Sequence, residues 1–348
     1  MRNKGLICLI LIVVMMAVGC SSKDTQVETS KDGTKVQDNK GQEKDSDVDA
    51  TKEGKENVHS DEDKKKEEID DVTSASKKED NKLEFDSIPE KVAVGTIGLT
   101  EIFDALTIDL VGVPSSKSHN IPERYADLPA IGMSMQPDME KLKSLELDVF
   151  ITDSALQDSL EESLKDKKIK AEFVQTSGYN DIIASIESIG KAFDKEDKAN
   201  EIIGNMKKVE KEVMDKIEGK DSKKVMIIFG TPESFMLATD MSYIGDLANR
   251  MNLENITDDM DIKSPYLPFS IESVVAMNPD VILRFTHADP ETSKKMFEKE
   301  FAENPVWNAL DAVKNEQVFD LDPHYFGVVA NIRCAEALEK LADMIYGE

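Results

Sequence analysis

The sequence predicts an α/β protein with two Rossmann-like lobes, each containing a central parallel sheet, bridged by one long α-helix and with a ligand cleft between the lobes. Glu140 precedes Asp148 by eight residues and Glu272 precedes Asp280 by eight, and each aspartate opens a short apolar run. Apolar runs without alternation are typical of parallel strands that are covered on both faces. A long amphipathic segment separates the two units, so we expect one lobe on each side of it.

Residues 1–20 have the features of a lipoprotein signal peptide. Arg2 and Lys4 precede an apolar stretch that is too short for a stable membrane span, and small residues then lead to Cys20. The pattern resembles a bacterial lipobox, although Ala17 stands where leucine is commoner. We expect Cys20 to carry lipid such as palmitate after cleavage and to anchor the protein to the outer face of the cytoplasmic membrane. An uncleaved membrane anchor is the alternative.

Residues 21–85 are predicted to form a disordered, charged tether. Between Ser21 and Asp80 there is no proline and no aromatic residue, and lysine alternates densely with aspartate and glutamate. Such a segment cannot bury enough apolar surface to fold. The formal net charge of the whole chain is -27, which argues against nucleic acid as a partner.

The first lobe, residues 86–194, is expected to open with a strand at Lys91–Val94, followed by a glycine-containing turn and a helix. The start of a helix presents backbone N–H groups at the positive end of the helix dipole. Ile97, Gly98 and Leu99 are therefore candidates for binding the carboxylates of a ligand, although most turns of this kind bind nothing.

Two loops of the same lobe supply further candidates. Leu110–Val113 is predicted as a strand, and Ser116 and Lys117 follow it in a loop where they could pair with a ligand anion; a solvated loop lysine is the alternative. Ile131–Asp138 is a second loop, which ends at a helix start. It contains Met135, whose thioether is a soft ligand suited to iron in a porphyrin or to copper. Packing within the loop is the more ordinary role for this side chain.

A single amphipathic helix is predicted across residues 195–219. Apolar side chains recur at helical spacing from Ala199 to Ile217, Asp194 is the expected N-cap, and Gly219 ends the helix. Such a helix would extend about 35 Å, which is long enough to bridge two lobes. One helical crossover predicts limited hinge motion.

The second lobe, residues 220–348, repeats the arrangement. Val281–Leu283 is predicted to be a buried strand whose carboxyl end leads to His287. Open α/β sheets bind ligands in the loops after their strands, so His287 is a candidate ligand residue. Tyr266 and Tyr325 are expected in loops near the cleft, where they could stack on a flat ligand or pack between the lobes.

The residues argue against catalysis and against a zinc or manganese receptor. The sequence contains no glycine-rich phosphate loop, no nucleophile elbow and no cluster of cysteines. Cys334 would be the sole cysteine left besides lipidated Cys20, so we expect no intramolecular disulfide and a core role for Cys334. Only His119, His287 and His324 lie outside the tether, and their spacing does not suit a metal cluster.

Four segments carry a resemblance to a known family: Ile131–Asp138, Leu237–Leu247, Asn278–His287 and Lys294–Phe301. From about Pro89 to Tyr346 the chain resembles the helical-backbone (class III) substrate-binding lipoproteins of ATP-driven importers for iron complexes and cobalamin. Within this group it is most similar to the haem-receptor lipoproteins of the iron-regulated surface determinant system in Gram-positive bacteria.

The resemblance implies a haem-binding receptor in which Met135 and His287, from opposite lobes, hold the iron. It also implies that Glu140 and Glu272 pair with arginines of the membrane permease; ordinary first-turn helix carboxylates are the alternative. The implied partners are the permease and ATPase of a haem importer and the surface proteins that pass haem to it. A receptor for a ferric siderophore or for cobalamin is the alternative function within the same importer class.

Overall fold

The structure is a computed structural model and describes residues 81–116, 120–231, 234–260, 262–268, 270–286 and 290–347. These residues belong to one compact unit, Glu68–Glu348. The predicted signal peptide, nearly all of the tether, Cys20, Lys117 and His287 lie outside the described residues. None of the helices in these ranges is long and apolar enough to cross a membrane.

The first lobe contains a three-stranded parallel sheet in the order β1-β4-β5. The strands are β1 Val92–Val94, β4 Val149–Asp153 and β5 Ala171–Val174, and the helices are α1 Ile97–Ala105, α2 Met139–Ser144, α3 Gln157–Asp166 and α4 Tyr179–Ala192. Every residue of β1 and β4 is buried, as the apolar runs predicted. The predicted strand at Leu110–Val113 is wrong in extent, because only Gly112 and Val113 form isolated bridges before Pro114, which has no N–H to donate.

The second lobe contains a six-stranded sheet in the order β11-β10-β6-β7-β9, with β8 also paired to β6. Its strands are β6 Lys224–Gly230, β7 Phe235–Ala238, β8 Glu254–Asn255, β9 Tyr266–Pro268, β10 Val281–Thr286 and β11 Val318–Asp320. Its helices are α6 Tyr243–Arg250, α7 Ile271–Met277, α8 Pro290–Glu303, α9 Asp311–Lys314 and α10 Cys334–Tyr346.

The parallel core of this second sheet matches the prediction, but one edge of the sheet differs from it. β10 pairs in parallel with β6 and β11, whereas β7 pairs antiparallel with both β6 and β9. Tyr266 therefore begins a strand rather than lying in the expected loop. The α/β fold class is confirmed, with a parallel sheet in the first lobe and a mixed sheet with a parallel core in the second.

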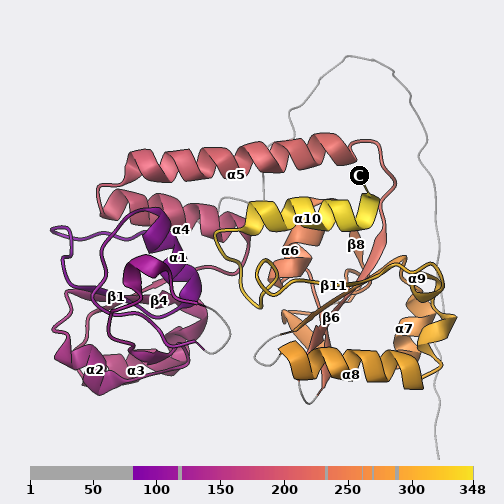
Figure 1. Cartoon of the computed structure of the whole chain (residues 1–348), viewed down its shortest axis with the longest axis horizontal. Coiled ribbons are helices and arrows are strands. Elements are labelled where there is room, and N and C mark those ends of the chain that lie inside the picture. The colour runs from indigo at the N-terminus through magenta and orange to yellow at the C-terminus, as the bar shows by residue number, and fades with distance from the viewer. Residues whose placement is uncertain are drawn as a thin grey trace, which may run out of the picture. The chain divides into compact units, whose positions relative to one another are not determined.

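The helix α5, Glu196–Ile217, connects the lobes (Figure 1). The prediction of Asp194 as its N-cap is wrong, because a φ of 53° puts Asp194 in the left-handed region and Lys195 becomes the cap. Gly219, with a φ of 75°, follows the helix end as predicted. α10 packs along α5, and Figure 1 shows the two helices side by side.

The repeated unit that the sequence suggested has a corresponding aspartate-to-backbone contact in both lobes. The Asp148 carboxylate, just before β4, accepts hydrogen bonds from the backbone N–H groups of Glu90 and Lys91 at 2.8 and 2.9 Å. The Asp280 carboxylate, just before β10, accepts one from the N–H of Lys224 at 2.8 Å. Asp148 therefore joins the start of β4 to the start of β1, and Asp280 joins the start of β10 to the start of β6. Each contact fixes the register of its parallel pair.

The largest apolar cluster includes side chains from β1, α4, α5, β6 and α10 and therefore runs through both lobes. Cys334 is fully buried in it, and burial raises the pKa of its thiol above the ordinary value. The expected core role of Cys334 agrees with this position. α10 begins at Cys334, and just before it the Ala330 N–H donates to the carbonyl of Thr176 in the other lobe at 3.0 Å.

Candidate functional site

Met135 lies in the turn of a short hairpin formed by β2, Gly132–Met133, and β3, Gln136–Pro137. The hairpin is closed by a hydrogen bond of 2.7 Å from the Asp138 N–H to the Ile131 carbonyl. The Asp138 side chain then caps α2, at the helix start that the sequence predicted. Met135 is 73% exposed, the most of any large apolar residue in the described ranges. Its thioether is therefore not used in packing this lobe.

The loop that contains Ser116 lies beside this hairpin. The Ser115 N–H donates to the Gly132 carbonyl at 2.7 Å, and the Ile131 N–H donates to the Val113 carbonyl at 2.9 Å. Two candidate segments that are separate in the sequence are thus brought together. Ser116 itself is exposed, and Lys117, the other candidate in this loop, lies outside the described residues.

The turn at the start of α1 supports only part of the predicted carboxylate site. The Leu99 side chain is fully buried, and its N–H donates to the Thr96 hydroxyl at 3.2 Å, because Thr96 is the N-cap. Leu99 therefore offers neither its side chain nor its N–H to a ligand, which corrects the prediction for this residue. Ile97 and Gly98 are partly exposed and remain candidates.

His287 follows β10 directly but lies outside the described residues. The strand end that leads to it is well defined, since Phe285 and Thr286 are in register with Phe229 and Gly230 of β6. Arg284 holds the neighbouring edge strand through two hydrogen bonds to Asp320 at 2.7 and 2.8 Å. His287 thus follows the carboxyl end of a strand that is paired on both sides, where ligands of open α/β sheets bind.

Tyr266 lies at the same end of the second sheet. Its ring contacts the rings of Phe229 and Phe285, with centroids 4.9 and 6.3 Å apart, and its hydroxyl donates to the Val328 carbonyl at 3.2 Å. Burial raises the pKa of Tyr266, so the phenol stays neutral. This residue therefore lies close to the strand end that precedes His287.

Tyr325 is held by contacts of its own. The ammonium group of Lys340 lies 4.5 Å from the centre of the Tyr325 ring, and the Tyr325 carbonyl accepts a hydrogen bond of 3.1 Å from the Tyr243 hydroxyl. One face of the ring is thus engaged by α10, which favours the packing role that the sequence left open.

Glu140 and Glu272 occupy equivalent positions. Each is the second residue of the helix, α2 or α7, that precedes the second parallel strand of its lobe. The Glu140 carboxylate is exposed and pairs with the Lys167 ammonium at 2.6 Å, and this hydrogen bond lowers the pKa of Glu140. The side chain of Glu272 lies outside what the structure describes.

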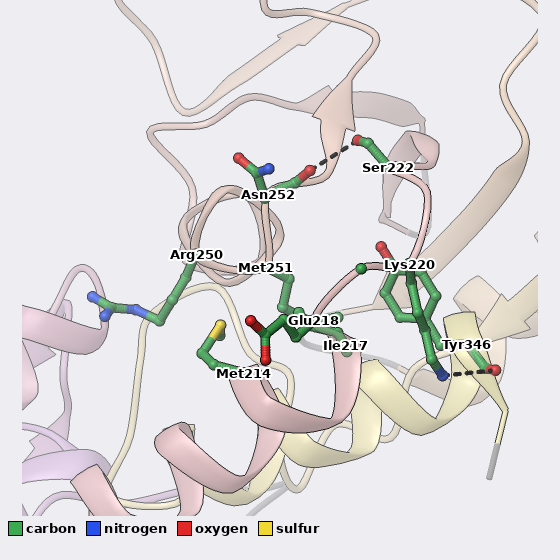
Figure 2. A pocket seen from close by; sticks show the side chains of 10 residues that line it. Met214, Ile217, Glu218, Lys220, Ser222, Arg250, Met251, Asn252 and Tyr346 are labelled. Carbon is green, nitrogen blue, oxygen red and sulfur yellow. Dashed lines mark hydrogen bonds between the residues drawn. The ribbon is translucent and has the colours of Figure 1, made fainter.

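A cavity of about 220 Å³ lies at the carboxyl end of α5 (Figure 2). Its lining comes from α5, α6 and the chain end, including Met214, Ile217, Arg250, Met251 and Tyr346. None of the predicted ligand residues lines it, and it is smaller than the roughly 300 to 1,000 Å³ of ordinary ligand pockets. Within the described ranges, no group of three or more His, Cys, Asp or Glu side chains could hold a metal ion.

One contact between the lobes had no signal in the sequence. The Arg333 guanidinium, just before α10, donates a hydrogen bond to the Glu101 carboxylate on α1, across a separation of 232 residues. Neither residue stood out by motif or spacing, and only the folded chain brings the two together.

Comparison with known proteins matches residues 92–325 to the model of a family described as periplasmic binding protein. The high-affinity heme uptake system protein IsdE of Staphylococcus aureus (strain bovine RF122 / ET3-1) is 34% identical over 275 residues, 79% of this chain and 91% of the relative. The crystal structure of S. aureus IsdE complexed with heme has a TM-score of 0.68 and 34% identity, and covers 74% of this chain and 98% of that one. An ABC transporter substrate-binding protein from Listeria monocytogenes EGD-e gives a TM-score of 0.69 at 34% identity, covering 74% of this chain and 99% of that one.

Proposed function

This chain belongs to the periplasmic binding protein family, and we propose that it is the haem-binding receptor of an ABC importer. The observation that carries the proposal is the 34% identity to a heme uptake protein over a length that includes both lobes. Haem is the transported ligand, and the protein acts by binding and release rather than by catalysis. Iron acquisition is the purpose that this activity serves.

We assign the axial iron ligands to Met135 and His287. Methionine and histidine form a known axial pair for haem iron. Two features support this choice: Met135 is 73% exposed in a hairpin turn of the first lobe, and His287 follows the carboxyl end of β10 in the second lobe. The two residues lie on opposite lobes, so one iron atom held by both would be bound between them. Ile97, Gly98 and Ser116 are the residues we assign to the propionates.

Affinity in this site would come mainly from burying the porphyrin ring. Haem is anionic and the chain carries a formal net charge of -27, so long-range attraction does not assist binding. Burial of apolar surface and the two iron bonds must therefore supply the free energy. Tyr266, with its neutral phenol and its contacts to Phe229 and Phe285, supplies an aromatic surface near the His287 end.

The proposal includes attachment and delivery. Lipid on Cys20 would hold the receptor on the outer face of the membrane of a Gram-positive cell, and the charged segment up to residue 85 would act as its tether. Haem would arrive from surface haem-transfer proteins and leave to a permease and its ATPase. Glu140 and Glu272, one on each lobe, are the carboxylates that we assign to permease docking.

Titration of the purified protein with haemin tests the ligand assignment. We expect a low-spin, six-coordinate absorption spectrum, because both axial positions would be filled by the protein. His287→Ala should weaken binding more than Met135→Ala, since imidazole is the stronger ligand for ferric iron. Met133→Ala is the matched control, because Met133 is 48% exposed on the same hairpin and is not assigned to the iron.

Haemin binding that is equally tight in His287→Ala, Met135→Ala and the unaltered protein would exclude the assigned ligands. The fold alone does not distinguish porphyrin from other iron complexes. Tight binding of a ferric catecholate or hydroxamate, or of cobalamin, without binding of haemin would establish the alternative receptor function instead.

A further inference from the structure

Residues 322–333, here termed the interlobe segment, connect β11 to α10 and contact both lobes. Its contacts with the second lobe are made by two tyrosine hydroxyls. Tyr243 donates to the Tyr325 carbonyl at 3.1 Å, and Tyr266 donates to the Val328 carbonyl at 3.2 Å. These bonds fix the backbone of the segment against α6 and β9.

The same segment is bonded to the first lobe. The Ala330 N–H donates to the Thr176 carbonyl at 3.0 Å, and the Arg333 guanidinium forms an ion pair with Glu101. The approach to α1 is close, because a methyl group added at Gly98 would lie 3.7 Å from the Ala330 carbonyl oxygen. The lobes are thus joined by noncovalent contacts at this segment in addition to α5.

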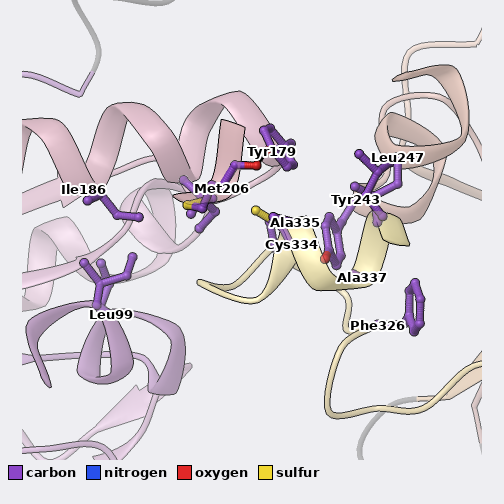
Figure 3. Packing of buried hydrophobic residues seen from close by; sticks show 14 of the residues in the cluster. Leu99, Tyr179, Ile186, Met206, Tyr243, Leu247, Phe326, Cys334, Ala335 and Ala337 are labelled. Atoms are coloured by element: carbon purple, nitrogen blue, oxygen red, sulfur yellow. Dashed lines mark hydrogen bonds between the residues drawn. The ribbon is translucent and has the colours of Figure 1, made fainter. Parts of the chain in front are cut away.

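The ion pair has little access to solvent. The side chains of Arg333 and Glu101 are 19% and 16% exposed. Arg333 makes a further hydrogen bond, from Nε to the His324 carbonyl at 3.3 Å, so its guanidinium is fixed from both sides. The start of α10 is buried beside it, and Figure 3 shows Cys334 and Ala335 in the apolar cluster with Tyr179 and Met206 of the first lobe and α5. A charge pair in such surroundings is screened less than an exposed one.

We propose that Glu101 and Arg333 are positioning residues that fix the spacing of the two lobes before the ligand arrives. The lobe contact itself does not depend on the proposed haem function; only its expected effect on iron binding rests on that function. If Met135 and His287 bind one iron from opposite lobes, the lobe spacing decides whether both bonds can form at once. A site held at that spacing in advance loses less conformational entropy on binding, which strengthens affinity.

The first test uses the full chain without haem. Glu101→Gln keeps the shape of the side chain and removes its charge, and we expect amide hydrogen exchange in residues 322–333 to become about tenfold faster, because the charge of one partner of a mostly buried pair is lost. Asp109→Asn is the control, since it removes one charge of the Arg124 to Asp109 pair, which lies inside the first lobe and is remote in sequence from the segment. It should leave exchange in the interlobe segment unchanged.

The second test uses haemin. Glu101→Gln should weaken haemin binding roughly tenfold and add a five-coordinate, high-spin component to the spectrum, while Asp109→Asn should do neither. The exchanged pair Glu101→Arg with Arg333→Glu should recover part of the slow exchange and of the low-spin spectrum, but not all, because a carboxylate at position 333 cannot donate to the His324 carbonyl. A role in local stability of either residue alone predicts no recovery.

If amide hydrogen exchange in residues 322–333 is unchanged in Glu101→Gln, the proposal is overturned. This outcome does not depend on the identity of the ligand, because the exchange is measured without ligand. If Glu101→Gln does not fold, Arg333→Lys keeps the charge but loses the planar fork, and it must still speed exchange for the proposal to stand. Failure of the unaltered protein to bind haemin would reject the proposed function and leave the exchange test of the lobe contact intact.

Discussion

At the scale of single residues, Asp148 links the electrostatics of the fold to its register. Its carboxylate accepts two backbone hydrogen bonds at the start of β1, and chiefly the one from Lys91 lowers the pKa of Asp148 below its ordinary value of 3.8. A pKa that is lower in the folded state than in the unfolded state means that the ionised carboxylate stabilises the fold. That stabilisation is present above the unfolded pKa and is lost as the pH falls through the folded pKa.

Asp148→Asn should therefore lower the free energy of unfolding at pH 7, because the amide oxygen accepts the same hydrogen bonds without a charge. The difference between variant and unaltered protein should shrink as the pH falls below about 4. Urea unfolding at pH values from 7 to 3 measures this difference. A deficit that stays constant over the whole range would show that the charge of Asp148 is not responsible.

Residue-level predictions succeeded where a short local pattern determines the geometry. Asp138 was predictable as a helix cap because it stands directly before α2 with a proline before it. The prediction of Asp194 as the N-cap of α5 failed because the tight connection from α4 puts Asp194 at a positive φ. The Lys195 N–H donates to the Gly190 carbonyl in this connection, and Lys195 becomes the cap. The pair of Glu101 and Arg333 depends on tertiary structure alone.

At the scale of secondary-structure elements, α5 contains one residue that weakens it. Gly204 lies in the interior of this helix, and a methyl group added there would meet no atom within 4 Å. Glycine in a helix interior costs about 1 kcal/mol relative to alanine, because its backbone loses more freedom on folding. Gly190 in α4 is different, since its added methyl group would lie 2.5 Å from the side chain of Ala199.

Gly204→Ala should therefore stabilise the protein by about 1 kcal/mol and raise the melting temperature by roughly 2 °C. Gly190→Ala should destabilise it by about 1 to 3 kcal/mol through overpacking. Thermal denaturation compares the two variants. A lower melting temperature for Gly204→Ala would mean that α5 needs the glycine for a reason other than helix propensity.

Elements were predictable where hydrophobic periodicity is long or burial is complete. α5 repeats its apolar residues over 22 residues, and β4 and β10 are unbroken apolar runs at their starts. β7 and β9 are only 4 and 3 residues long, which is too short for a periodic pattern to show. These strands form because β7 pairs antiparallel with the edge of β6 that β10 does not occupy. The other edge of β7 then pairs with β9.

At the scale of the whole molecule, the equivalent placement of Glu140 and Glu272 matters more than either residue. Both lobes place a helix before the second parallel strand, and both helices have glutamate as their second residue. In the free protein the Glu140 carboxylate pairs with Lys167 at 2.6 Å. If Glu140 docks as proposed, an arginine of the permease would replace this lysine, so docking would exchange one ion pair for another and the Glu140 carboxylate would contribute modestly.

Substitution of either glutamate by alanine should therefore reduce haem import by no more than about fivefold, as for exposed ion pairs. Replacement of both, Glu140→Lys with Glu272→Lys, places like charges against the expected arginines and should reduce import at least about tenfold. Haemin affinity of the purified double variant should not change, because neither residue is assigned to the ligand. Import of haem by cells and titration with haemin measure the two effects separately.

Glu212→Lys with Glu339→Lys is the matched control for this double variant, since both side chains are exposed, lie on α5 and α10, and change the net charge by the same amount. Normal import in the control and loss of import in the docking variant would separate a local docking effect from a general effect of charge. Normal import in the docking variant would reject the assignment of Glu140 and Glu272 to the permease. Loss of haemin binding in the purified docking variant would instead show that these carboxylates help to hold the ligand site together. No permease is present in that measurement, so repulsion from its arginines cannot be the cause.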